Sequence, residues 1–226
     1  MPVFRFGLNE INYLKSRDRI LGEAIDRIGI IEREINPDIF ASLVSSIISQ
    51  QISGKASETV WNKLCEKVGE VTPENIAKIS EPDLQSCGMS YRKAGYIMGI
   101  TEAVIRRKIH LDKLASLPDD EVISELIKLK GIGVWTAEMI LIFSLGRPDV
   151  VSYKDFGIRK GMMKLYGLDK LTSDTFEQYR KLYSPYGTVA SLYLWEIASK
   201  DFQNKASQID LTIARPDRSA DRWSKR

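Results

Sequence analysis

The chain has 226 residues, 43% of them hydrophobic, so it can bury a core large enough for one domain or two small lobes. No apolar run approaches the roughly 20 residues that a membrane-spanning helix needs, which excludes a protein anchored by such a helix. Two widely separated cysteines, Cys65 and Cys87, favour a reducing compartment. The formal net charge is only +3, so any binding of nucleic acid must depend on where charges are placed.

Apolar residues recur at helical spacing along almost the whole chain, with no sustained strand-like alternation, which predicts an all-α fold. The first clear helix is expected to begin after Asn36 as N-cap, with Pro37 in its first turn. Its apolar stripe leads to a polar loop that contains Gln50 and Gln51. Glycine and proline then separate short helices, at Gly69, Pro73, Pro82, Gly88 and Pro118.

Two glycines between two helical patterns mark the most informative segment, Leu129 to Ala137. Helical spacing continues to Leu129, so Gly131 is expected to end the first helix and Gly133 to precede the second. The second helix, residues 134–145, is apolar on nearly every face and is expected to be buried. Unpaired amides at a helix N-terminus bind anions, so the pattern predicts a phosphate-binding hairpin. A plain tight turn would carry the same two glycines.

Asp155 stands where the next helix should begin, because apolar residues from Phe156 to Tyr166 then recur at helical spacing up to Gly167. An aspartate there is commonly an ordinary N-cap. The N-terminus of a helix also favours negative charge, which an electrostatic catalyst for a cationic transition state requires. The two roles are compatible.

Four segments together resemble the helix-hairpin-helix superfamily of DNA glycosylases, and within it the 3-methyladenine DNA glycosylase II branch. They are residues 48–53, residues 88–94, the hairpin and the segment that begins at Asp155. The resemblance spans roughly Pro37 to Lys200 and keeps the family's order. It implies a two-lobed all-α fold with the active-site cleft between the lobes. The central lobe would be residues 36–130, the second lobe residues 1–35 plus 131–204, and residues 205–226 a polar, basic and flexible tail.

The resemblance implies a monofunctional glycosylase that flips out alkylated, cationic purines of the 3-methyladenine type and leaves an abasic site in base excision repair. Members that also cut the DNA backbone carry a lysine two residues after the second glycine, where this chain has Trp135. Two cysteines cannot build the iron–sulfur cluster of other members. No cofactor is expected to be required. A structural monovalent cation, Na⁺ or K⁺, at the hairpin is implied by resemblance alone, held by main-chain oxygens of Ile127, Leu129 and Ile132.

Site residues carried over by the resemblance fall into three groups. Asp155 would be catalytic. The pocket for a cationic base would be aromatic because of cation–π attraction, with Trp135, Tyr153, Trp195, Tyr193 and Trp61 as candidates. The DNA-binding candidates are Gln50, Gln51, Gly131, Gly133, Val134, Thr136, Lys154 and Arg159. Gln51 would fill the gap left by the flipped base, where some relatives use leucine. Gly187 stands where many relatives carry an arginine.

Two other functions stay open from the sequence. One is a non-catalytic helix-hairpin-helix module that only binds DNA or a damaged site; the other is a glycosylase for neutral bases such as hypoxanthine, ethenoadenine or uracil. His110, the only histidine, is interpreted as a surface or packed residue rather than a metal ligand. The expected partner is double-stranded DNA with a damaged base, bound by a monomer in the cytoplasm (nucleoid) or nucleus.

Overall fold

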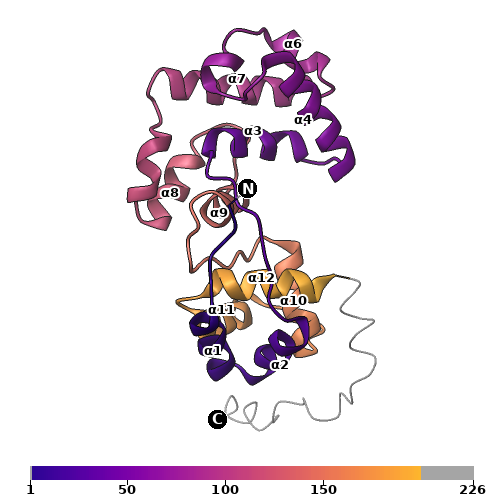
Figure 1. Ribbon diagram of the computed structural model, residues 1–226, viewed down its shortest axis with the longest axis vertical. Helices are drawn as coiled ribbons and strands as arrows, with labels where there is room; N and C mark the ends of the chain where they lie inside the picture. Colours follow the sequence, from indigo (N-terminus) through magenta and orange to yellow (C-terminus); the bar gives the residue numbers. More distant parts are fainter. Residues whose placement is uncertain (1, 200–226) are drawn as a thin grey trace, which may run out of the picture. The chain divides into compact units, whose positions relative to one another are not determined.

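The computed structural model describes residues 2–199, and the predicted tail, residues 205–226, lies outside this range. Within the described range the chain is helical and forms no β-strand, only one isolated bridge between Val3 and Glu34, which confirms the all-α prediction. The elements are α1 (Leu8–Arg17), α2 (Arg19–Ile28), α3 (Ile39–Ser49), α4 (Gly54–Val68), α5 (Pro73–Ile76), α6 (Glu81–Ser86), α7 (Tyr91–Ile105), the 3-10 helix η1 (Leu111–Ser116), α8 (Asp119–Leu126), α9 (Val134–Phe143), α10 (Phe156–Tyr166), α11 (Ser173–Tyr183) and α12 (Gly187–Ala198) (Figure 1).

The chain divides into two compact units. Unit 1 contains residues 2–5 and 33–147, and unit 2 contains residues 6–32 and 148–199. This differs from the predicted lobes, because the hairpin and α9 belong to unit 1 rather than to the unit that holds Asp155. The reason lies in packing: α9 contacts α3 and α8. The guanidinium of Arg147, the last residue of unit 1, also donates hydrogen bonds to backbone carbonyls of η1 and its C-cap.

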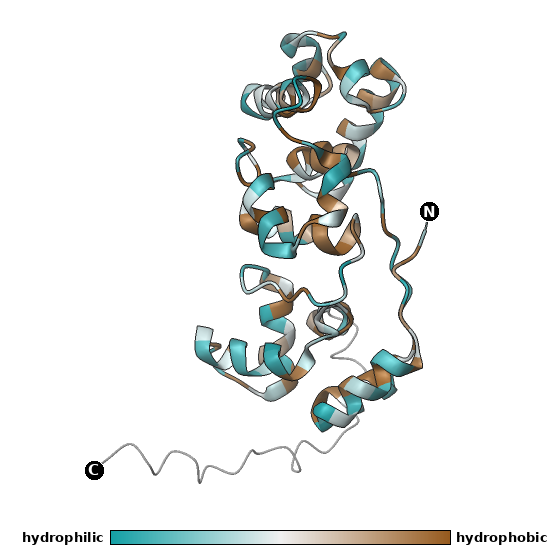
Figure 2. Ribbon diagram, turned by 90° about the vertical axis from the view of Figure 1, so that its left-hand side faces the viewer, coloured by the Kyte–Doolittle hydropathy of each residue, from teal (hydrophilic) through white to brown (hydrophobic). Residues whose placement is uncertain are grey.

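Unit 1 is built around α3, whose apolar stripe is buried as predicted. The cap differs from the prediction, since Asp38 rather than Asn36 is the N-cap and its carboxylate accepts from the Ala41 N–H at 2.9 Å. Asn36 instead accepts from the Asp38 N–H at 3.0 Å. The helix therefore begins two residues later than the prediction placed it. Most helices of both units are amphipathic, with hydrophobic and hydrophilic residues on the same helix (Figure 2).

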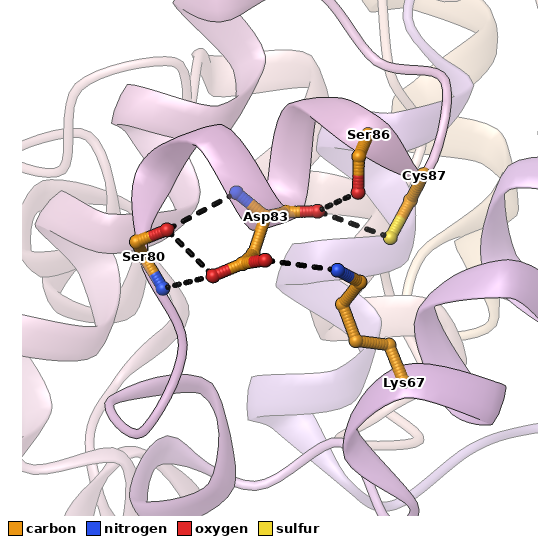
Figure 3. Close-up of polar contacts among 5 residues, drawn as sticks. All are labelled: Lys67, Ser80, Asp83, Ser86 and Cys87. Carbon is orange, nitrogen blue, oxygen red and sulfur yellow. Dashed lines mark hydrogen bonds and ion pairs between the residues drawn. The ribbon is translucent and has the colours of Figure 1, made fainter.

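A polar cluster fixes the start of α6 against α4 (Figure 3). Asp83 accepts from the Ser80 N–H at 3.1 Å and Ser80 Oγ at 2.6 Å, while Lys67 Nζ lies 3.0 Å from its other oxygen. These hydrogen bonds lower the pKa of Asp83 to about 2, and the bond from the Ser80 side chain has the largest effect. Cys87 is packed beside this cluster, and burial raises the pKa of its thiol, so the thiol stays protonated and structural at neutral pH.

Unit 2 is built around α12, which is buried along most of its length. Helices α10, α2, α1 and α11 all contact α12. A buried network joins the surrounding helices: the Tyr166 hydroxyl donates to Asp18 Oδ2 at 2.5 Å and lies 2.6 Å from the Tyr183 hydroxyl. Burial raises the pKa of both tyrosines. Although α12 is apolar, none of the helices within residues 2–199 is both long and apolar enough to cross a membrane.

Candidate active site

Asp155 is the N-cap of α10, as the sequence predicts. Its Oδ1 accepts from the Ile158 N–H at 2.8 Å, and the residue is 7% exposed. A buried carboxylate needs hydrogen bonds to remain charged, and the amides at a helix start supply them together with a favourable dipole. The sequence folds this way locally because aspartate is a strong N-cap residue and the next eleven residues continue as a helix.

A second hydrogen-bond donor to Asp155 comes from a residue that is distant in sequence. The indole Nε1 of Trp195, on α12, donates to Asp155 Oδ1 at 2.9 Å. The interaction crosses 40 residues of sequence, so local patterns could not indicate it. Trp195 was predicted only as a candidate for an aromatic base pocket; the structure places its ring-edge N–H on the acid.

Two glycines of α10 allow this close approach. A Cβ at Gly161 would lie 2.1 Å from the carbonyl oxygen of Leu194, and one at Gly157 would lie 2.7 Å from Trp195 Cδ1. At Gly161 only glycine fits without movement of the α12 backbone, and at Gly157 only glycine fits without displacement of the Trp195 ring. Two glycines one helical turn apart lie on the same face of a helix, so their spacing in the sequence is a signal from which a close helix contact could be predicted.

Two more aromatic side chains lie near Asp155 in sequence and reach the surface of unit 2. Tyr153 is 37% exposed, packs edge-on against Phe176 with centroids 5.0 Å apart, and has the Arg159 guanidinium 5.3 Å from its ring centre. Phe156 is 74% exposed. The prediction that Phe156 belongs to the apolar stripe of its helix is wrong, because the first position of α10 points to solvent. A large exposed aromatic beside the acid is a binding candidate that sequence periodicity missed.

Tyr193 does not belong to a surface pocket. Its side chain has no exposed area, its hydroxyl donates to the Gly29 carbonyl at 3.0 Å, and its ring meets Phe6 edge-on. The prediction that Tyr193 lines a base pocket is wrong. Tyr193 lies two residues before Trp195 on α12, so its side chain points to a different side of the helix, into the core of unit 2. Burial also raises the pKa of Tyr193, as expected for a core hydroxyl.

The hairpin lies in unit 1. Helix α8 ends at Leu126, so the helix that was expected to reach Leu129 stops three residues earlier, and a turn of residues 127–133 leads to α9. Gly131 therefore lies within this turn rather than directly after the helix. It has φ +91°, and a Cβ there would lie 2.5 Å from the Tyr96 ring. Both its conformation and its contact require glycine.

Gly133 is the N-cap of α9 and has no side chain that could cover the helix start. A Cβ built on Gly133 would meet no atom within 4 Å, so the approach to the first amides of α9 is open. Thr136 is buried and Val134 half-buried, which leaves their main-chain amides as the groups suited to an anion. Trp135, which follows, is 43% exposed.

The glutamine loop is fastened to the hairpin and to α7. Gln50 Nε2 donates to the Gly131 carbonyl at 2.9 Å. Lys93 Nζ donates to the carbonyls of Ile48 at 2.8 Å and Gln50 at 2.6 Å. Burial lowers the pKa of Lys93, and the neighbouring Arg92 lowers it further. Three of the four segments behind the resemblance thus meet in unit 1.

Gln51 has an unusual backbone for a residue with a side chain. Its φ is +59° and it is exposed, a conformation that costs about 1–3 kcal/mol outside glycine and is often held at functional sites. Beside it lies a cavity of 260 Å³, lined among others by Gln50, Met89, Arg92 and Lys93. Trp61 follows the cavity residue Val60 on α4 and is half-buried.

Substitution Lys93→Met should loosen this loop. Hydrogen bonds from a charged donor are worth about 1.5–3 kcal/mol, so amide exchange of residues 50–52, measured by NMR or mass spectrometry, should accelerate roughly 10-fold or more. Arg92→Met is the matched control, since Arg92 is exposed and its loss removes the same charge without removing the loop's bonds. Equal acceleration in both variants would contradict a holding role for Lys93.

The cation implied at the hairpin stays a prediction. Ile127, Leu129 and Ile132 all lie in the turn between α8 and α9, where carbonyl oxygens are not committed to a continuous helix. Carbonyl oxygen is the donor that hard cations prefer, so the chemistry of the turn fits. Elsewhere in the described range no group of three or more histidine, cysteine, aspartate or glutamate residues could hold a metal ion.

The packing at the start of α12 explains why residue 187 is a glycine. It opens α12, its N–H donates to Asp149 Oδ1 at 3.0 Å, and a Cβ would lie 2.7 Å from both Asp149 Oδ1 and Val151 Cγ2. Its position is buried. An arginine, which many glycosylases of the resembled superfamily carry here, would not fit this packing.

An all-helical chain with an open glycine hairpin in one unit and a buried, helix-capping carboxylate in the other is a helix-hairpin-helix protein. Residues 44–185 match the HhH-GPD superfamily of base excision DNA repair proteins, and the chain belongs to this superfamily.

Proteins similar to this chain include DNA-3-methyladenine glycosylases. DNA-3-methyladenine glycosylase 1 of Schizosaccharomyces pombe is 35% identical over 162 residues, which are 70% of this chain and 71% of that protein. The crystal structure of a DNA-3-methyladenine glycosidase from Bacillus halodurans matches with a TM-score of 0.80 at 35% identity, over 90% of this chain and 95% of that one. The Schizosaccharomyces pombe 3-methyladenine DNA glycosylase in complex with abasic DNA matches with a TM-score of 0.72 at 29% identity, over 83% and 95%.

Proposed function

We propose that this protein is a monofunctional DNA glycosylase that excises alkylated, cationic purines of the 3-methyladenine type in base excision repair. The observation that carries the proposal is the buried carboxylate of Asp155, which two N–H donors hold at the start of α10. Relatives named for this activity at 35% identity support the same substrate class. A DNA substrate would place the protein in the nucleoid or nucleus.

The reaction breaks the bond between C1′ of deoxyribose and the purine nitrogen. The electron pair leaves with the base, which an N-alkyl group has already made cationic, so no general acid is needed. Positive charge then develops on the sugar, and the carboxylate of Asp155 stabilises it. Water adds to C1′ and loses a proton, which Asp155 can accept before solvent takes it.

Residues of both units are candidates for binding DNA. The open amides at the start of α9 suit a phosphate, and basic side chains add attraction that depends on salt; Lys154 and Arg159 of unit 2 are candidates for it. Gln51, which is exposed, would occupy the gap that base flipping leaves. Flipping costs on the order of a few kcal/mol, so a residue that supports the opened stack lowers the barrier.

Exposed aromatic side chains would contact the flipped base. Tyr153 and Phe156, which stand next to Asp155 in sequence in unit 2, have the exposed area for this role. Cation–π attraction of roughly 0.5–2 kcal/mol would favour a charged base over a neutral one. Because Trp135 stands where a lyase would carry its lysine, the protein is proposed to form no Schiff base with the sugar.

Purified protein and DNA treated with a methylating agent test the proposal. We expect release of 3-methyladenine, abasic sites that heat or alkali converts to breaks, and no covalent adduct after borohydride reduction. A parallel panel with hypoxanthine, ethenoadenine and uracil should react more slowly. Binding to damaged DNA without base release would instead identify a non-catalytic module, and equal rates on cationic and neutral bases would overturn the proposed substrate class.

A further inference from the structure

The residue that orients the acid comes from a different helix than the acid itself. Trp195 Nε1 and the Ile158 N–H both donate to Oδ1 of Asp155, at 2.9 and 2.8 Å. The Ile158 amide belongs to the same helix turn as the aspartate and is a property of any capped helix. The hydrogen bond from the Trp195 indole is additional to this ordinary cap, and it holds the carboxylate from a second helix.

The packing around the indole is built for this bond. A Cβ at Gly157 would lie 2.7 Å from Trp195 Cδ1 and 3.1 Å from Asp155 Oδ1, and thus against both groups that form the hydrogen bond. One turn later, a Cβ at Gly161 would meet the backbone of Leu194, the neighbour of Trp195. Two glycines on one face of α10 therefore bring α12, and with it the indole edge, to the carboxylate.

We propose that Trp195 is a positioning residue that acts through Asp155: its indole N–H holds the carboxylate in the orientation that base excision needs. The inference rests on the function proposed above. It assigns to Trp195 a role other than the stacking role that the sequence predicted, because the atom in contact with the acid lies in the plane of the ring, at its edge.

The chemistry of indole suits this role and excludes a proton-transfer role. Indole Nε1–H is a donor only, so Trp195 cannot accept the proton that the attacking water loses. A hydrogen bond to an ionised acceptor is about twice as strong as one between neutral groups. The donor is also carried by a rigid ring on a buried helix, so little side-chain freedom is lost when the bond forms.

Trp195→Phe removes the N–H and keeps an aromatic ring. With DNA that contains one methylated purine and enzyme in excess, we expect the single-turnover excision rate to fall about 10- to 100-fold. The affinity for DNA that carries a non-hydrolysable analogue of the methylated nucleotide should not change. If Trp195 instead stacked on the base, the substitution should mainly weaken binding of the lesion and reduce the preference for cationic bases.

A double-mutant cycle shows whether the effect passes through the acid. In the Asp155→Asn background, Trp195→Phe should lower the residual rate by no more than about twofold, since there is no carboxylate left to position. If the two losses multiply instead, the proposal is overturned. If Asp155→Asn alone leaves excision unchanged, the proposed function fails, and this result is distinct from failure of the positioning role.

Tyr193→Phe is the matched control, because Tyr193 lies in the core on the same helix and also donates one hydrogen bond, to Gly29 rather than to Asp155. It should leave the excision rate unchanged. A spectroscopic readout works without activity: the indole N–H resonance of Trp195, assigned by its absence in Trp195→Phe, should shift in Asp155→Asn. No shift in a folded Asp155→Asn variant would contradict the bond and overturn the proposal.

Discussion

Asp155→Asn should lower the rate of base release by about 10²- to 10³-fold, the range found when one electrostatic partner of a transition state is removed. Asparagine has nearly the shape of aspartate, is an equally good N-cap and keeps an oxygen that can accept from the Ile158 N–H. What it lacks is the negative charge opposite the developing sugar cation. Folding and DNA affinity should therefore remain close to those of the wild type while excision is lost.

The measurement is a single-turnover assay on methylated duplex DNA, with binding to abasic-analogue DNA followed in parallel. Asp83→Asn is the matched control: it removes another carboxylate from a helix start, one whose pKa is about 2 and which is therefore ionised at neutral pH. That variant should excise at the wild-type rate. An Asp155→Asn variant that is folded and still excises at the wild-type rate would refute the catalytic role.

Local features of the site could be predicted from the sequence. The N-cap position of Asp155 and the glycine-based hairpin before α9 both depend on a few neighbouring residues. They follow from backbone rules for caps and turns, which operate over four or five positions. The resemblance then supplied what no local rule contains, namely that these two distant features belong to one functional class.

Features that depend on distant partners were missed or wrong. Tyr193 and Trp195 are two residues apart on α12, yet one enters the core and the other reaches Asp155. Phe156 follows the helical pattern and still points to solvent. The boundary between the units is at Arg147 because of bonds to residues about thirty positions earlier. In each case tertiary packing decides among arrangements that the local sequence permits equally.

Substitution of glycine by alanine should have opposite effects at two helical positions, because only one of them lies where α10 and α12 approach closely. Gly161→Ala would place a Cβ 2.1 Å from a backbone oxygen of α12, which cannot move without displacing the helix that holds Trp195. We expect a loss of about 3 kcal/mol of unfolding free energy or more. For a chain of this length that corresponds to a fall in Tm of roughly 6–12 °C.

Gly99→Ala is its counterpart. Gly99 lies inside α7, is exposed, and a Cβ there would meet no atom within 4 Å. Alanine should stabilise this helix by about 0.5–1 kcal/mol, because glycine loses more backbone entropy on folding. Thermal unfolding followed by circular dichroism gives both values. Stabilisation by Gly161→Ala as well would show that α10 and α12 do not approach so closely, and the bond from Trp195 to Asp155 would then lose its structural basis.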